Sequence, residues 1–136
     1  MAWETNVGLD VSFAAASNLS TKQFYFVLLN SSKKLALCAA AASESFLGVL
    51  QNDPNTDQVG EVRTGGVSKV ACGGTFDAGD LLASDSAGKA VKYTKATVFT
   101  GTPYVVSGSS VLGVALEGGL SGQLAAMLVS PRGLSN

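Results

Sequence analysis

The residues that could carry out catalysis are few, and the chain contains no histidine. Histidine is the usual general base, the usual partner of a nucleophilic serine or cysteine, and a common metal ligand. A Ser–Lys pair around Lys69 or Lys89 is the one formal alternative, but no serine lies in a pattern that would hold it at a strained turn. The sequence therefore predicts no catalytic residues and no enzymatic activity.

One acidic stretch has the spacing of a metal site. Asp53, Asn55 and Asp57 match the first, third and fifth ligands of a calcium loop. The sixth position holds Gln58 where the loop needs glycine, and the twelfth holds Thr64 where it needs a bidentate glutamate. We interpret the stretch as an ordinary surface loop, and we expect neither a metal ion nor a cofactor.

Two cysteines, Cys38 and Cys72, lie in apolar segments. They are too few and too far apart for a zinc knuckle. Cysteine without a metal or a reactive setting packs as a small hydrophobic residue, and we expect both side chains to be buried. The sequence alone leaves a disulfide between them open.

The overall charge favours neither nucleic acid nor membranes as partners. Nine basic and ten acidic residues give a net charge of -1, and the basic residues are not clustered with aromatic ones. The longest strictly apolar run, residues 35–42, is shorter than the ~20 residues of a membrane-spanning helix. The first ten residues lack the basic and apolar regions of a signal peptide. We therefore expect synthesis in a cytoplasm. Because only 14% of residues are charged, we also expect that part of the surface is covered by another chain and that the protein functions within an assembly.

The elements that would position any site are short strands. Strand-like segments recur every 8–12 residues between glycine-rich turns, and no long segment has a helical period. The length of 136 residues suits one domain. The predicted fold class is all-β, a small single-domain sandwich or barrel of short antiparallel strands.

A weak internal duplication accompanies these strands. The pattern Ser-x-Leu-Gly-Val occurs at residues 45–49 and again 65 positions later at residues 110–114. Each copy is followed by a polar loop and then by Gly-polar-apolar, at residues 60–62 and 122–124. Two landmarks in the same order predict two strand-loop-strand units, although β proteins also reuse such short motifs by chance.

Residues 1–20 read as an N-terminal arm, and residues 21–136 as the β domain. The arm trails off in small residues after a short strand-like stretch and carries Trp3, the only tryptophan. Tryptophan favours interface hot spots, so Trp3 either anchors the arm in a partner or folds back on its own domain. Residues 23–30 form a strand that is apolar on both faces, which predicts cover on both sides.

Residues 20–133 resemble a family of small capsid-associated proteins of tailed phages, known as head decoration, cement or capsid fibre proteins. The residues that carry the resemblance are turn and strand signatures: Phe46-Leu47-Gly48-Val49-Leu50-Gln51-Asn52, 62–70 with Gly66, Lys69 and Val70, Ala78-Gly79-Asp80-Leu81, Ser84-Asp85, Gly88-Lys89-Ala90-Val91, Leu112-Gly113-Val114-Ala115-Leu116-Glu117, Gly122-Gln123-Leu124 and Leu128-Val129-Ser130-Pro131. None of these signatures is catalytic, and the first twenty residues lie outside the resemblance.

The resemblance implies a virion structural protein on the outer surface of an assembled capsid. Its partners would be the major capsid protein and itself, as a homotrimer, and it would reach the virion from the cytoplasm of the bacterial host. We expect Phe24, Tyr25 and Phe26 in the trimer contact and Trp3 on a neighbouring subunit. Two other functions stay open, a tail or baseplate adaptor and a carbohydrate-binding β module displayed on the virion, although no row of Trp and Tyr suggests stacking on sugars.

Overall fold

The computed structural model describes residues 9–38, 46–93, 96–98, 105–107 and 111–133. Every regular element in these ranges is a strand. The same ranges contain no helix that is long and apolar enough to cross a membrane. The strands are β1 (Leu9–Ala14), β2 (Phe26–Leu29), β3 (Leu35–Leu37), β4 (Phe46–Leu50), β5 (Val59–Ala71), β6 (Leu81–Ser84), β7 (Ala90–Lys92), β8 (Ala96–Val98), β9 (Val105–Ser107), β10 (Val111–Ala115) and β11 (Leu124–Gly133).

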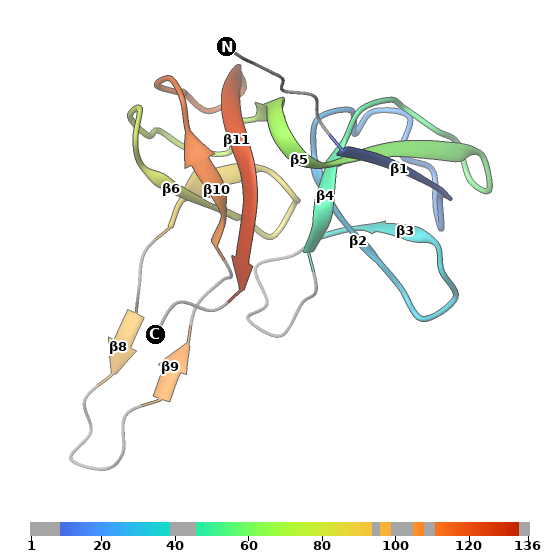
Figure 1. Cartoon of the computed structure of the whole chain (residues 1–136), viewed down its shortest axis with the longest axis horizontal. Helices are drawn as coiled ribbons and strands as arrows, with labels where there is room; N and C mark the ends of the chain where they lie inside the picture. The colour runs from blue at the N-terminus through green and yellow to red at the C-terminus, as the bar shows by residue number, and fades with distance from the viewer. Residues whose placement is uncertain (1–8, 39–45, 94–95, 99–104, 108–110, 134–136) are drawn as a thin grey trace.

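Antiparallel pairing joins most strands into one curled sheet in the order β3-β2-β4-β5-β11-β10-β6-β7, with β1 also paired to β5 (Figure 1). β8 and β9 form a separate hairpin. The all-β, antiparallel single domain predicted from the sequence is confirmed, as a sheet curled into a half-barrel.

The strand order contains the same arrangement twice. Read from its two ends, the sheet gives β3-β2-β4-β5 and β7-β6-β10-β11. In both groups a hairpin is followed, after a connection, by a strand that pairs with the first strand of that hairpin. The weak duplication seen in the sequence is therefore a duplication of the whole fold unit.

The hairpin turns repeat in atomic detail. The side-chain oxygen of Asn30 accepts hydrogen bonds from the backbone N–H groups two and four residues further on, at 3.0 Å each. Asp85, 55 positions later, accepts the same two bonds at 2.8 and 2.9 Å. The third residue after each, Lys33 and Gly88, has positive φ, 62° and 84°. A lysine held in this region shows that the tertiary fold and the side-chain bonds impose the turn.

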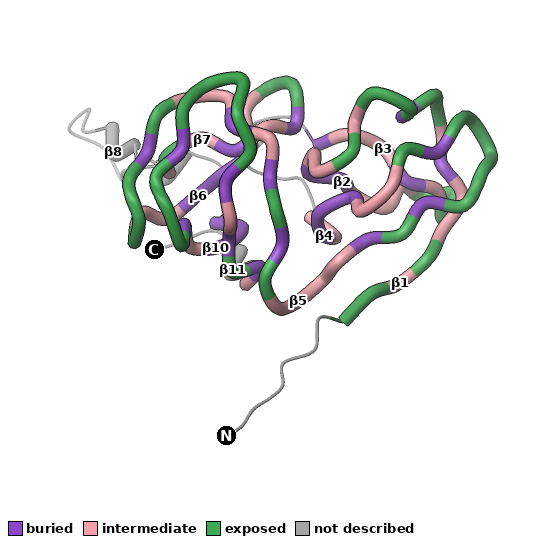
Figure 2. The backbone as a smooth tube through the Cα atoms, turned by 90° about the horizontal axis from the view of Figure 1, so that it is seen from above, coloured by how far each residue is buried: buried purple, intermediate pink, exposed green. Residues whose placement is uncertain are grey.

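β5 belongs to both units and joins them (Figures 1 and 2). Residues 59–65 pair with β1, residues 62 and 63 also pair with β4, and residues 66–71 pair with β11. Gly66, with φ of 92°, is the first residue of the second part. We call residues 9–63 the first half and residues 66–133 the second half; the second part of β5 occupies in the second half the place of β1 in the first.

Part of the N-terminal arm contributes to this sheet. Residues 9–14 are β1, and the side chains of Ala15 and Leu19 are buried. Residues 1–8, and with them Trp3, lie outside the described residues.

Two hydrophobic cores fill the molecule. Paired residues share a face of a sheet, so Leu50 and its partner Val62 define the inner face of the first half, and Val49 and its partner Arg63 its outer face. The first core contains inner residues of the first half: Ala15, Leu19, Val27, Leu35, Leu50 and Val62. The second core contains second-half residues, Val70, Cys72, Phe76, Leu82, Ala90, Leu112, Ala115, Ala125, Met127 and Val129, together with Phe26, Cys38 and Val49.

The composition of the second core shows that the halves pack head to tail. Phe26 and Val49 pair with each other on the outer face of the first half, yet both are fully buried with inner residues of the second half. Side-chain size permits this packing. Leu35 and Leu50 fill the first half from within, whereas the matching positions of the second half hold Ala90 and Ala115, which leave room for aromatic and branched side chains from outside.

Candidate functional site

Large apolar side chains are exposed on the outer face of the second half. In β5, Ser68 and Val70 are buried, while Val67 is 52% exposed and Lys69 is also exposed. Cys72, directly after the strand, is buried on the same face as Ser68 and Val70. In β11, Leu128 lies opposite Val67, and its side chain is 40% exposed.

The apolar row continues across two more strands. Val114 of β10 lies opposite Leu128, and Leu81 of β6 lies opposite Val114. Both are half-buried. We define the outer patch as the apolar residues on this face: Val67, Leu81, Val114, Leu116, Leu124, Ala126 and Leu128.

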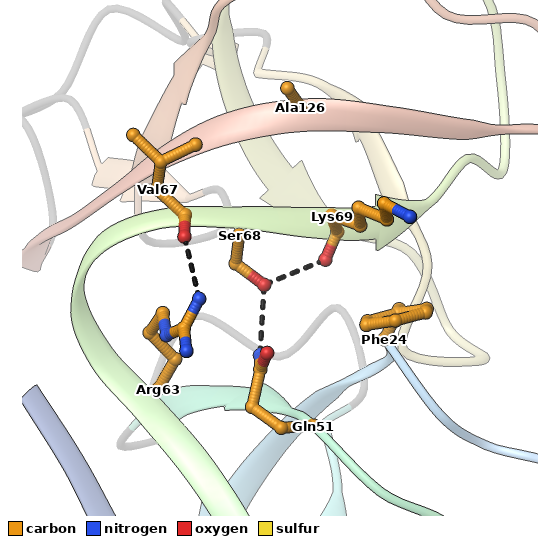
Figure 3. Close-up of a pocket in the computed structure, with 7 residues that line it drawn as sticks. All are labelled: Phe24, Gln51, Arg63, Val67, Ser68, Lys69 and Ala126. Atoms are coloured by element: carbon orange, nitrogen blue, oxygen red, sulfur yellow. Dashed lines mark hydrogen bonds between the residues drawn. The ribbon is translucent and has the colours of Figure 1, made fainter. Parts of the chain in front are cut away.

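A pocket of about 390 Å³ lies at the edge of the outer patch, where β5 passes from one half to the other (Figure 3). It is lined by Phe24, Gln51, Arg63, Val67, Ser68, Lys69 and Ala126. Gln51 Nε2 donates to Ser68 Oγ at 2.8 Å, and this hydroxyl donates to the Lys69 carbonyl at 2.8 Å. These bonds fix the pocket floor by joining β5 to the residue after β4.

The positive charge of Arg63, on one side of the pocket, is compensated by the carboxylate of Asp10. Arg63 Nε donates to Asp10 Oδ1 at 3.0 Å and Arg63 Nη1 to the Val67 carbonyl at 2.9 Å. The hydrogen bond to Asp10, aided by its negative charge and opposed by burial, raises the pKa of Arg63. Within the described residues no carboxylate lies within 4.0 Å of Lys69. Glu117 accepts a hydrogen bond from the Ala126 N–H at 2.9 Å and places a negative charge beside the patch.

The residues that the sequence predicts at an interface differ in how far they are buried and in what surrounds them. Phe24 is half-buried, has φ of 69°, and lines the pocket. Tyr25 is half-buried, with Lys22 Nζ 5.0 Å and Lys89 Nζ 5.8 Å from its ring centre. Phe26 is fully buried in the chain's own core, so in this fold its side chain offers no surface to a partner. Trp3 lies outside the described residues.

The described residues contain no group of three or more His, Cys, Asp or Glu side chains that could hold a metal ion. In the stretch with calcium-like spacing, Asp57 Oδ1 accepts from Lys34 Nζ at 2.7 Å. Its φ of 66° makes it a turn residue. The chemistry available at the outer patch and pocket is therefore contact with apolar groups, bordered by the positive charge of Lys69 and the negative charge of Glu117.

Both cysteines are buried, as the sequence predicts, and no disulfide joins them. Burial raises the pKa of the Cys72 thiol, the charge of Glu117 raises it further, and a hydrogen bond with the backbone of Leu120 lowers it in part.

A pH dependence follows from the Cys72 thiol. Because its thiolate is less stable in the folded than in the unfolded protein, its contribution to stability is complete below the ordinary thiol pKa of about 8.5 and is lost as the pH rises towards its folded pKa. We expect the free energy of unfolding, measured in urea between pH 7 and pH 10, to fall more steeply for the wild type than for Cys72→Ala. Parallel curves for the two proteins would contradict this account.

The outer patch itself was missed at the level of sequence. The alternation in Val67, Lys69 and Ala71 assigns these residues to one face, but the same pattern fits a face covered by another element. The patch is recognised by comparing equivalent positions of the two halves. These equivalent positions are known only once the pairing of the strands is known.

No family model and no curated protein matches this chain. Its fold is similar to a solved structure described as the N base of the head fiber protein gp8.5 in bacteriophage phi29, with a TM-score of 0.59 and 18% sequence identity. The match covers 96% of this chain and 100% of that chain. At this identity the likeness concerns the arrangement of the strands, and the two chains share a fold.

Proposed function

We propose that this chain is a structural protein of a bacteriophage head that binds the outer surface of the assembled capsid as an oligomer and stabilises it. The observation that carries the proposal is the fold, which matches the base of a phage head fibre over nearly the whole length of both chains. The family resemblance of the sequence points the same way. In this role the chain is no enzyme, its partners are the major capsid protein and further copies of itself, as a homotrimer, and its location is the virion surface.

The proposed mechanism is thermodynamic linkage. A protein that binds the assembled shell, but not its separated subunits, shifts the equilibrium towards the shell by the free energy of binding. Several copies joined in one oligomer gain further, because each bound copy raises the effective concentration of the others. Weak individual contacts then suffice, which suits a surface of mixed apolar and neutral polar residues such as the outer patch and its surroundings.

The test uses phage heads prepared without this chain. We expect the purified protein to co-sediment with the heads, to saturate at a fixed number of copies per capsid, and to raise the temperature at which the heads release DNA. Isolated capsid subunits serve as the control and are expected not to bind. Binding to purified tails or to glycans in place of heads would overturn the proposal in favour of an adaptor or a carbohydrate-binding module.

A further inference from the structure

We propose that the outer patch is the surface through which copies of this chain associate, patch to patch, around a symmetry axis. The inference deepens the proposed function by naming the contact within the oligomer, and it rests on that function only for the expectation that the chain is oligomeric.

The two halves present equivalent pairs of residues on their outer faces. Phe26 pairs with Val49 in the first half as Leu81 pairs with Val114 in the second. The first pair is fully buried beneath the other half, whereas the second lies half-buried in the outer patch. The outer face is thus an interface between the halves in the first half. In the second half the same face has no intramolecular cover among the described residues.

A second copy cannot cover the outer patch by repeating the internal packing. That packing needs an inner face with small side chains, such as the one around Ala90 and Ala115. The inner face of the first half is filled by Leu35 and Leu50, both fully buried, and the inner face of the second half already holds Phe26. The copies are then left to meet through their outer faces, which in a homotrimer converge on the threefold axis, so that each contact joins one part of the outer patch to a different part of the neighbouring one.

Charge and shape suit a copy of the same chain. The surface carries Lys69 on one side and Glu117 at its edge, so two identical patches bring together no net charge of one sign. A strongly charged partner would instead require a patch whose charged residues all have the sign opposite to its own. The pocket, which Val67 and Ala126 of the outer patch line together with Phe24, can receive a side chain from the neighbouring copy (Figure 3).

The experiment compares Leu128→Asp with Val59→Asp by sedimentation equilibrium of the full chain. Val59 is 61% exposed and lies on the outer face of the first half, at the position that matches Leu124 of the outer patch, so it controls for adding a charge to an exposed strand. We expect the wild type to associate at micromolar concentration, Leu128→Asp to weaken association by roughly 100-fold or more, and Val59→Asp to change it by less than about 3-fold. Circular dichroism checks that each variant folds; should Leu128→Asp fail to fold, Val67→Lys addresses the same contact from β5.

The possible failures are distinguishable. A wild type that stays monomeric at high concentration, or a Leu128→Asp variant that assembles like the wild type, overturns this inference. If that variant assembles normally but no longer binds heads, the outer patch contacts the capsid, and the proposed function survives without this inference. Association through the patch without any binding to heads supports the inference and overturns the proposed function.

Discussion

Replacing Gly113 by alanine is expected to lower the free energy of unfolding by about 3 kcal/mol or more. Gly113 lies in β10 between Val129 of β11 and Leu82 of β6. A Cβ atom there would overlap the carbonyl oxygen of Leu128 and approach Met127 Cε to 2.8 Å. The carbonyl is backbone of the neighbouring strand and cannot rotate away, so the strands must separate. Urea unfolding followed by far-ultraviolet circular dichroism measures the loss.

Gly48 and Gly65 supply matched comparisons for this prediction. Gly48, 65 positions before Gly113, would overlap the carbonyl of Arg63 in the same way, so Gly48→Ala is expected to destabilise by a similar amount. Gly65, in β5, has no atom within 4 Å of an added Cβ, and Gly65→Ala is expected to change stability by less than about 1 kcal/mol. Equal losses for Gly113→Ala and Gly65→Ala would show that strand approach is not the cause.

These two glycines also explain why the duplication was visible in the sequence. Gly48 and Gly113 recur because each meets a carbonyl of the neighbouring strand, so the packing constrains the residue type itself. The second landmark, residues 60–62 against 122–124, finds the correct strands but aligns them three residues out of register. In the structure the Glu61 carbonyl accepts from Gln51 N–H, and the Ala126 carbonyl accepts from the matching Leu116 N–H.

The register error has a physical origin in the turns. Gly122 takes positive φ of 86°, and the residue that matches it, Asp57, takes 66° without being glycine. Once the tertiary fold imposes a backbone conformation, a residue other than glycine can occupy it at a moderate cost in free energy. Aligning glycine with glycine therefore shifts the second strand.

Cover on both sides, expected for residues 23–30, is found at the centre of this segment, where the neighbouring Phe26 and Val27 are fully buried on opposite faces of β2. The other residues of the segment are half-buried or exposed. Sequence alone cannot say whether a second cover comes from the same chain or from another copy, because both remove the same apolar area from water. The sequence accordingly suggests Phe26 for the trimer contact, whereas the structure covers its side chain with the other half of its own chain. The face that lacks such a cover among the described residues, around Val67 and Leu128, follows from the register of the paired strands, which the sequence does not reveal.

Replacing Phe26 by alanine is expected to destabilise the fold by about 3–5 kcal/mol. Its ring lies 5.4 Å from that of Phe46 in an edge-to-face arrangement at 88°, and it is buried in the core that joins the two halves. The loss combines the transfer of the ring to water with the cavity left between the halves. The free energy of unfolding of a domain of this size is roughly 5–15 kcal/mol. The urea concentration at which half of the protein is unfolded should therefore fall by a large fraction.

Leu81→Ala is the matched control, because Leu81 occupies in the second half the place of Phe26 in the first. Leu81 is half-buried on the outer patch, so in a dilute, monomeric sample its truncation is expected to lower the free energy of unfolding by only about 1 kcal/mol. The contrast between the two variants measures how much the head-to-tail contact adds at one position of the repeated unit. Comparable losses would mean that Phe26 contributes only within its own half, and would contradict the contrast between the covered face of the first half and the outer patch of the second.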